Sequence, residues 1–284
     1  DCVWNGMTLT DEVTKTMSCG ETYCNNAQVV VVNKDVADKY QDVESLKELN
    51  FAVESGSAGE AAATEAGLNY TAVLTQADAL MEVSAGTSDA CIIDLLMAGA
   101  MIGEGTSYPD LTYDAEQKLT TEEYGIGCRK GSDLAAFINN VLAETYADGS
   151  MKKVADTYKL ADAMVEQAAP DANYTVPTDG DVAYIQNKGK LVVGITEFEP
   201  MDYKDASGNW IGFDADMAKL VAEKLGVDIE FTVINWDNKI MELDSKSIDV
   251  VWNGMTLTDE VKNSMECTNP YFNNAQVVVT KAAE

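Results

Sequence analysis

The chain of 284 residues contains no histidine and only one arginine, Arg129. The lack of histidine excludes His-based catalytic triads, histidine proton shuttles and histidine metal sites. Positive charge is also scarce, because 19 Lys and Arg stand against 48 Asp and Glu, a net charge of −29. No basic stripe is available to neutralise phosphates, so we expect no nucleic-acid partner, and anionic membrane surfaces would repel the chain.

Long apolar runs and metal-binding cysteine patterns are absent as well. No run approaches the roughly 18 residues that a membrane-spanning helix needs, and no signal peptide precedes the opening DCVWNGMTL. No CxxC pair occurs, so we expect no zinc site, no thioredoxin chemistry and no cofactor. Cys19 and Cys24 either form a disulfide across a turn or are buried free thiols. The other cysteines are Cys2, Cys91, Cys128 and Cys267.

The composition is that of a globular protein. Hydrophobic residues make up 46% of the chain, with 20 Gly and 5 Pro, unlike a disordered or collagen-like sequence. A chain of 284 residues is long enough to form one large domain or two ordinary ones around a sizeable core.

A duplicated segment organises the sequence. Residues 1–31 recur as residues 249–279, with 22 of the 31 positions identical and no gap. The two copies bracket unrelated sequence, so the repeating unit is a whole domain of 248 residues. We therefore expect either a slice of a tandem array or a circularly permuted domain with overlapping ends.

Strand and helix patterns alternate along the chain, which predicts an α/β fold with a parallel sheet. Two such blocks are present, and extended segments flank the second one. We expect two lobes, the second inserted into the first through two crossing strands, an architecture that suits closure around a ligand. The first block has strands at 188–198, 229–234 and 247–253 and helices at 214–226 and 237–246; the second covers 43–96, its flanking segments are 26–34 and 122–131, and two helices follow over 133–160.

A linker is expected where the helical pattern ends and the strongest strand begins. Residues 164–187 hold Pro170, Pro177 and Gly180 among small polar residues. The domain would then begin near Lys188 and end near Ala163. The expected parts are 1–31 (second part of lobe 1), 32–121 (lobe 2), 122–163 (return hinge and C-terminal helices of lobe 1), 164–187 (linker) and 188–284 (first part of lobe 1).

Read in this order, the chain resembles the type II periplasmic solute-binding proteins for polar amino acids, the extracytoplasmic receptors of ABC importers. The opening KGKLVVGITEFEPMDYKDASGNWIGFDADMAKLVAEKLG carries the resemblance, followed by IDVVWNGMTLTDE, LKELNFAVESGSAGE, SDACIIDLL and EEYGIGCRKGSDLAAFINNVLAETYADGSMKK. The resemblance implies the two-lobe, periplasmic-binding-protein-like α/β fold, here in circularly permuted order with a duplicated 31-residue segment at the two ends.

The resemblance implies ligand-binding residues in the first lobe. Phe198 and Trp236 fall where aromatic rings usually pack on the ligand. The WNGMT loop would offer backbone N–H and side-chain groups to an α-carboxylate. Its residues are Asn253, Gly254 and Thr256, duplicated as Asn5, Gly6 and Thr8. The alternative for Phe198 and Trp236 is an ordinary place in the core.

In the second lobe, the resemblance implies that Ser57 and Ala58 form the corresponding helix-entry loop. Asp94, in CIIDLL, matches the acid that receives the ligand's α-ammonium group. Two simpler alternatives stay open: Ser57 is only a helix N-cap, and Asp94 is only a solvated helix cap.

One position departs from the family's pattern. The helix after the WNGMT loop normally opens with an arginine that clamps the α-carboxylate, but here Val261 stands in that place, as Val13 does in the other copy. Arg129 matches a position near the hinge that is usually structural. A carboxylate could instead bind the helix N-terminus near Thr256–Thr258, where Asp259 and Glu260 would compete with it. The expected ligand is therefore an amino acid held without arginine, an amine or a neutral polar molecule.

The resemblance implies a binding protein and not an enzyme: ligand binds between the lobes, the lobes close, and a membrane permease recognises the closed form. Its setting would be extracellular or periplasmic, with a membrane tether in the full-length protein. Two other classes stay open. A dehydratase could use Glu54 or Glu197 with Asp94 as an acid–base pair, and a degenerate cleft could serve as a sensor or spacer in a tandem surface protein.

The duplication also predicts a composite domain, because two copies compete for one place in lobe 1. The C-terminal copy continues from the strand at 229–234, whereas the N-terminal copy continues into the hinge at 26–34. The copy left over would be displaced, disordered or inserted into a second molecule, giving a domain-swapped homo-oligomer.

Overall fold

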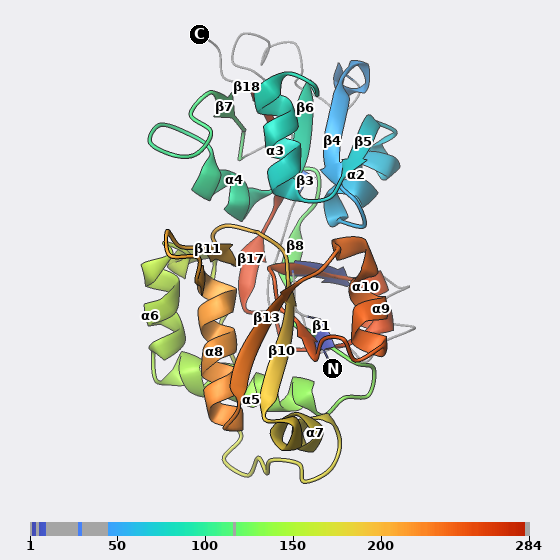
Figure 1. Ribbon diagram of the computed structural model, residues 1–284. Coiled ribbons are helices and arrows are strands. Elements are labelled where there is room, and N and C mark those ends of the chain that lie inside the picture. Colours follow the sequence, from blue (N-terminus) through green and yellow to red (C-terminus); the bar gives the residue numbers. More distant parts are fainter. Residues whose placement is uncertain (1, 4–5, 10–27, 30–44, 116–117, 282–284) are drawn as a thin grey trace. The chain divides into compact units, whose positions relative to one another are not determined.

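The computed structural model describes residues 2–3, 6–9, 28–29, 45–115 and 118–281. The chain divides into two compact units (Figure 1). Unit 1 comprises Asp1–Asn25 and Glu122–Asn273, and unit 2 comprises Asn26–Thr121 and Asn274–Glu284. Each unit has its own mixed α/β architecture.

The main sheet of unit 1 is built around a strand that is buried along almost its whole length. Strand β10 (Lys190–Ile195) is buried from Leu191 to Ile195, as expected for a strand covered on both faces. It pairs in parallel with β13 (Asp228–Val233) and β14 (Val250–Val251). The sheet order is β1-β9-β14-β10-β13, where β1 is Cys2–Val3 and β9 is Gly127–Cys128, and β16 (Glu266–Cys267) also pairs with β9.

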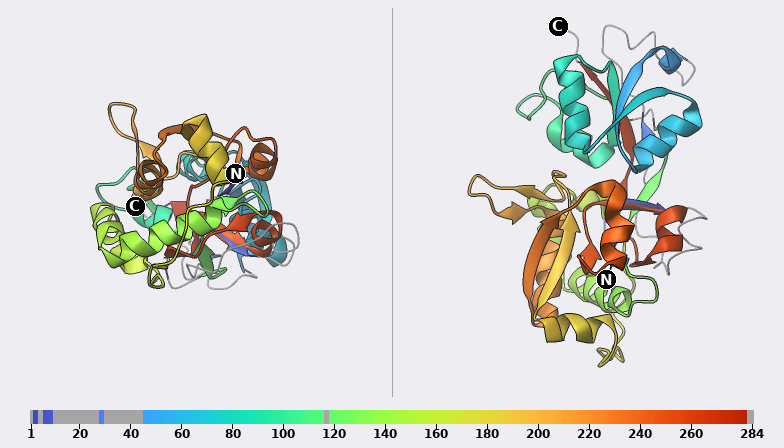
Figure 2. Two further views of the ribbon diagram at one scale, coloured as in Figure 1. Left: turned by 90° about the horizontal axis from the view of Figure 1, so that it is seen from below. Right: turned by 45° about the vertical axis from the view of Figure 1, so that its right-hand side comes forward.

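Helix α8 (Phe213–Leu225) packs on β10 and β13 (Figure 1). It buries Met217, Val221 and Leu225 at helical spacing and ends at Gly226, which adopts the left-handed conformation of a C-cap. Helices α5 and α7 lie at the end of the sheet where β10 begins (Figures 1 and 2). The remaining helices of unit 1 are α5 (Leu134–Ala147), α6 (Ser150–Thr157), α7 (Asp181–Lys188), α9 (Lys239–Asp244) and α10 (Asp259–Ser264), with 3₁₀ turns at Ala161–Ala163 (η3) and Trp236–Asn238 (η4).

Two smaller sheets complete unit 1. The first has the order β17-β8-β15-β2, with β17 at Phe272–Asn274, β8 at Glu122–Tyr124, β15 at Met255–Thr258 and β2 at Gly6–Leu9. The second is the hairpin of β11 (Tyr203–Lys204) and β12 (Trp210–Ile211).

Unit 2 repeats the strand–helix alternation. Its sheet has the order β3-β18-β6-β4-β5, and β7 also pairs with β18. Helix α3 packs on β4, β6 and β18, and α2 packs on β4 and β6. The elements are η2 (Ser45–Glu48), β4 (Asn50–Glu54), α2 (Ala58–Ala66), β5 (Asn69–Val73), α3 (Gln76–Ala85), β6 (Ala90–Asp94), α4 (Leu95–Met101), β7 (Leu111–Thr112), β18 (Gln276–Lys281) and β3 (Gln28–Val29).

The two copies of the duplicated segment occupy different places in these sheets. In the C-terminal copy, β14, β15 and β18 are interior strands, each with neighbours on both sides. The described strands of the N-terminal copy, β1, β2 and β3, all lie at sheet edges. Strand β3 pairs in parallel with its own duplicate, so that Gln28 lies opposite Gln276 and Val29 opposite Val277.

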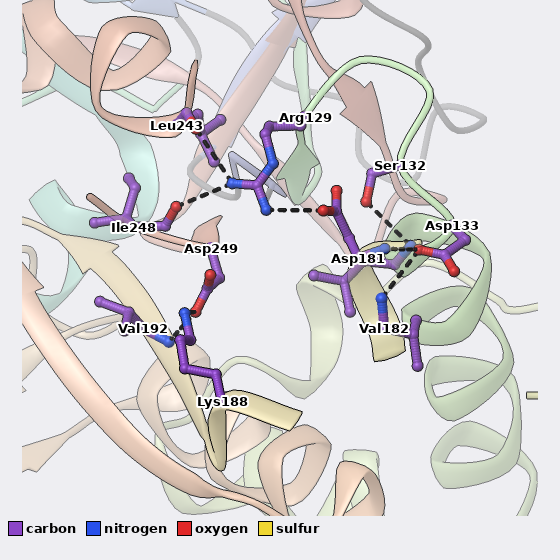
Figure 3. Close-up of polar contacts among 11 residues, drawn as sticks. Arg129, Ser132, Asp133, Asp181, Val182, Lys188, Val192, Leu243, Ile248 and Asp249 are labelled. Carbon is purple, nitrogen blue, oxygen red and sulfur yellow. Dashed lines mark hydrogen bonds and ion pairs between the residues drawn. The ribbon is translucent and has the colours of Figure 1, made fainter. Parts of the chain in front are cut away.

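The segment expected to be a linker, 164–187, contains most of helix α7. Asp133 fixes the start of this helix, because one carboxylate oxygen accepts hydrogen bonds from the N–H groups of Asp181 (2.9 Å) and Val182 (3.1 Å) (Figure 3). Before α7, the side chain of Gln167 donates to the carbonyl of Pro270, and the N–H of Val165 donates to the carbonyl of Tyr271 (3.0 Å). The segment is thus packed against unit 1 at both ends.

The described residues contain neither a membrane-spanning helix nor a cluster of metal ligands. None of their helices is long and apolar enough to cross a membrane. Within the same part of the chain, no group of three or more His, Cys, Asp or Glu side chains could hold a metal ion.

Candidate functional site

In unit 1, the candidate site is centred on Gly254, in the loop between β14 and β15. Gly254 has a φ of +61°, and a Cβ atom at this position would lie 2.6 Å from Cε1 of Phe198. Glycine is therefore required for the Phe198 ring to rest on the loop. Asn253 ties the loop to the end of β10: its Oδ1 accepts the N–H of Thr196 (2.7 Å), and its Nδ2 contacts the Thr196 hydroxyl (2.5 Å).

The loop that carries Phe198 is fixed at the start of helix α8. The N–H of Asp202 donates to the carbonyl of Phe198 (2.8 Å), and the N–H of Phe213 donates to the carbonyl of Pro200 (3.1 Å). Gly212 allows this approach, because its φ is +121° and a Cβ atom would lie 2.1 Å from the carbonyl oxygen of Met201. Phe198 is thus placed by backbone contacts on both sides.

Groups of the protein itself lie at the N-terminus of helix α10, where the sequence suggested that a ligand carboxylate could bind. The hydroxyl of Thr258 accepts the N–H of Val261 (3.2 Å) and so caps α10. Asp259 and Glu260 lie in the first turn of this helix. Behind the loop, the hydroxyl of Thr256 donates to Oε2 of the buried Glu122 (2.8 Å). The first turn of α10 thus carries two acidic residues, and Thr256 is hydrogen-bonded to a third.

Trp236, the second expected aromatic wall, is buried in the 3₁₀ turn η4. The ammonium group of Lys239 lies 4.6 Å from the centre of its ring and donates to its carbonyl oxygen (3.2 Å). A cation of the protein itself thus already lies against this ring. Phe198 and Trp236 are both buried, with 3% and 5% of their surface exposed, as the core alternative required.

In unit 2, the candidate site is built around Asp94, whose side chain is only 2% exposed at the junction of β6 and α4. Its Oδ2 accepts a hydrogen bond from the side-chain amide of Gln76, and its Oδ1 accepts one from the side-chain amide of Asn274. Gln76 Oε1 in turn accepts the N–H of Asp94 (2.9 Å), and Asn274 Oδ1 accepts the N–H of Leu96 (2.9 Å). Asp94 is therefore not a solvated helix cap; it is a buried carboxylate held by amide donors.

Ser57 is the N-cap of α2, and Ala58 is the first residue of that helix. The Ser57 hydroxyl accepts the N–H of Glu60 (3.1 Å), and Oε2 of Glu60 accepts the N–H of Gly56 (2.7 Å). This arrangement is a variant of the capping box, in which the glutamate accepts the N–H of the residue before the N-cap. It places a negative charge of the protein at the second helix entrance as well.

The single arginine is bound to groups of the unit 1 scaffold (Figure 3). Nη1 of Arg129 donates to the carbonyls of Leu243 and Ile248, both at 3.2 Å, and Nη2 forms an ion pair with Asp181 at 3.1 Å. This agrees with the structural role that the resemblance implied for Arg129.

Several expectations fall on residues that the structure does not describe, namely Asn5, Val13, Cys19 and Cys24. Gly6 and Thr8 lie in β2, where they pair with Met255 and Leu257 of the C-terminal copy. Cys128 is disulfide-bonded, a feature that sequence reasoning missed, whereas Cys91 and Cys267 are buried and form no disulfide.

Sequence reasoning also missed the partners of the candidate residues. Gln76 and Asn274 are 18 and 180 residues from Asp94 in the sequence, so no local pattern connects them. One signal was available for Asn274: it lies in the NNAQVVV stretch that occurs in both copies of the duplicated segment.

Comparison with known proteins gives matches in two blocks. A family model described as bacterial extracellular solute-binding proteins, family 3, matches residues 1–161 and 191–284. A probable histidine-binding protein of Neisseria gonorrhoeae is 38% identical over 95 residues, which are 33% of this chain and 35% of that protein. An arginine-binding extracellular protein of Bacillus subtilis is 35% identical over 95 residues, 33% of this chain and 37% of that protein.

These alignments cover little more than a third of the relatives' own length. Among solved structures, an ancestral amino-acid-binding protein, the precursor of a cyclohexadienyl dehydratase, is 40% identical over 28% of this chain and 36% of its own, with a TM-score of 0.28.

Proposed function

The chain belongs to the bacterial extracellular solute-binding proteins, family 3, and from this premise we propose that it is the solute-binding receptor of an ABC importer. Its ligand would be an amino acid or a related small polar nitrogen compound. The relatives' names support this class, because they are histidine- and arginine-binding proteins. The partner would be an importer permease in the membrane, and the setting extracellular or periplasmic with a membrane tether.

The observation that carries the proposal is the state of Asp94. Both oxygens of this buried carboxyl group accept hydrogen bonds from side-chain amides, so the group acts as a hydrogen-bond acceptor. Such a group is suited to bind an ammonium group, which supplies both positive charge and N–H donors.

The electrostatics around the other candidate residues favour the same ligand class. The only guanidinium of the chain is bound to Asp181 and two backbone carbonyls. The entrance of α2 carries Glu60, and the first turn of α10 carries Asp259 and Glu260. We therefore propose that a ligand with net positive charge is preferred over one whose only charge is a carboxylate.

We propose ligand-binding residues in each unit. They are Phe198, Trp236, Asn253, Gly254 and Thr256 of unit 1, and Ser57, Ala58 and Asp94 of unit 2. In this proposal, Ser57 contributes to binding by capping helix α2. Trp236 contributes its aromatic ring, against which Lys239 also lies.

The unusual chain order is part of the proposal. The family model matches two blocks that leave out residues 162–190, which nearly coincide with the segment 164–187 between the expected domain ends. This supports a permuted domain or a slice of a tandem array, with the C-terminal copy of the duplicated segment in the interior of the sheets. An exchange of the N-terminal copy between molecules would give a domain-swapped homo-oligomer.

A thermal-shift screen tests the proposed function. Arginine, lysine, histidine, cystine, glutamate and putrescine would each be added to the intact chain, and a ligand at about a hundredfold above its Kd raises the melting temperature by several degrees. We expect cationic amino acids or amines to give the largest shift and glutamate none. A shift with glutamate alone would contradict the charge preference, and no shift with any compound would contradict the receptor function.

Substitution of Asp94 locates the site. Asp94→Asn is expected to weaken binding of the best ligand on the order of 100-fold, because a charged partner is lost in a buried place. Asp110→Asn, at an exposed position of the same unit, is the matched control and should bind as the wild type does. Equal affinity of both variants would remove Asp94 from the site.

A further inference from the structure

Two carboxyl groups that the proposed function does not use are buried beneath the candidate site of unit 1. Asp202 and Asp214 are both 0% exposed. Asp202 closes the loop that starts at Phe198, and Asp214 lies in the first turn of α8, where its N–H donates to the carbonyl of Met201 (3.0 Å). The two residues are thus joined through the backbone of a single tight turn.

The surroundings of the two carboxyl groups differ. Oδ2 of Asp214 accepts the N–H of Gly254, and the polar side chains of Tyr271 and Trp252 act to lower the pKa of Asp214. These donors stabilise its ionised form. Neither oxygen of Asp202 has a hydrogen-bond partner among the described residues. A buried carboxylate without donors is costly, so Asp202 is the member of the pair that keeps its proton.

The nearest cation does not neutralise Asp202 by direct contact. The ammonium group of Lys219 donates to Asp216 (2.9 Å) and to the carbonyl of Trp210 (2.7 Å), and the hydroxyl of Tyr158 donates to the other oxygen of Asp216 (2.6 Å). Burial and the neighbouring Asp214 raise the pKa of Asp202 well above its usual range, Asp216 adds to this, and Lys219 opposes it. Burial raises the pKa of Asp214 to about 7, against the lowering effect of its donors.

We propose that Asp202 and Asp214 are a positioning pair, which places one negative charge beneath the N–H of Gly254 and so fixes the loop that carries Asn253 and Thr256. This inference rests on the proposed function only in that it takes this loop to contact the ligand. Asp214 holds the loop, and the uncharged Asp202 allows Asp214 to ionise. A second negative charge in the pair would repel the first in a place that water does not reach.

The pair makes the stability of the protein depend on pH in a definite direction. Both pKa values are raised in the folded state, so the contribution is present below the ordinary Asp pKa of about 4 and is lost as pH rises through the folded values. The pKa of Asp214 lies at about 7 in the folded protein, and Asp202, whose pKa is raised well above its ordinary value, is the member of the pair that we expect to hold its proton at higher pH. Because the chain has no histidine, no imidazole group titrates in this pH range.

The test is the melting temperature of the intact chain at pH values from 5 to 9, without ligand. The wild type is expected to lose about 2 °C per pH unit between pH 7 and 9, because unfolding releases one proton that the folded protein holds. Asp202→Asn, an uncharged isostere, should fold and abolish this loss. Asp228→Asn, at an exposed position on β13, should keep the wild-type profile.

Three results would overturn the proposal: an Asp202→Asn variant with the wild-type slope, one that does not fold at any pH, or an equal flattening by Asp228→Asn. Asp214→Asn gives a second readout. It should remove the change of melting temperature with pH near pH 7, where the raised pKa of Asp214 lies, and an unchanged profile there would contradict the pair.

Ligand affinity distinguishes positioning from stability alone. With the best compound of the screen, we expect Asp214→Asn to weaken binding several-fold at pH 8, because an uncharged acceptor holds the N–H of Gly254 less strongly, and Asp202→Asn to keep wild-type affinity. Wild-type affinity in Asp214→Asn would contradict the positioning role. The melting-temperature profiles need no ligand. A thermal-shift screen without a hit would therefore contradict the proposed function, whereas the Asp202–Asp214 pair is tested by the profiles alone.

Discussion

Unit 1 and unit 2 each bury carboxyl groups near a candidate site, but the hydrogen bonding of these carboxyl groups differs. In unit 2, each oxygen of Asp94 has an amide donor, from Gln76 or Asn274. In unit 1, the oxygens of Asp202 have no hydrogen-bond partner among the described residues, and burial together with Asp214 raises its pKa. Burial alone therefore does not decide the charge of an acid; the donors around it do. The first arrangement suits a ligand's ammonium group, and the second supports a loop.

The units also position their candidate loops by different forces. In unit 1 the fit is steric, since the Phe198 ring rests on Gly254. In unit 2 the helix entrance is fixed by hydrogen bonds, with Ser57 and Glu60 in a variant of the capping box. Substitutions in the two units should consequently have effects of different size.

The largest effect is expected for Gly254→Ala. Its φ is positive and the new Cβ would overlap Phe198, so we expect a loss of unfolding free energy on the order of 2 kcal/mol, measured by urea denaturation. Gly208→Ala is the control, because its φ is +84° and a Cβ would meet no atom within 4 Å. Equal losses in the two variants would show that strain alone, and not the Phe198 contact, fixes the loop.

A smaller effect is expected in unit 2 for Ser57→Ala, which removes an N-cap and should cost about 1 kcal/mol. Thr75 caps α3 in the same way, by accepting the N–H of Asp78 (3.0 Å), so Thr75→Ala should cost about as much. Ligand affinity separates the two variants: as part of the site, Ser57→Ala should weaken binding and Thr75→Ala should not. A loss of affinity in neither would leave Ser57 as a cap only.

The smallest effect concerns Glu123 of β8. Burial raises its pKa to about 7, against the opposing charge of Lys262. The folded value is raised, so its contribution to stability is present below pH 4.5 and is lost as pH rises through about 7. Because the side chain is half-exposed, Glu123→Gln should recover less than about 1 kcal/mol at pH 8, by urea denaturation, and nothing at pH 4. A larger gain at pH 4 than at pH 8 would contradict this assignment.

The same contrast separates what could be predicted from the sequence from what could not. Strand β10 and helix α8 were predictable, because an apolar run and a helical repeat closed by Gly226 are local signals. Helix α7 was not predicted, because Pro170, Pro177 and Gly180 precede it. The carboxylate that accepts its first N–H group comes from Asp133, 48 residues earlier. The resemblance pointed to Asp94, but not to the amides that hold it, which come from distant parts of the chain.

The most direct measurement compares Asp94→Asn with Asp202→Asn at pH 8.5 by their melting temperatures. In the first variant an amide group must face the amide donors of Gln76 and Asn274, so the melting temperature should fall below that of the wild type. In the second, an amide replaces an acid that would otherwise have to keep its proton, so the melting temperature should rise. Opposite signs are the predicted result; a shift of the same sign in both variants would contradict the claim that the hydrogen-bond donors around each buried acid decide the effect of replacing it.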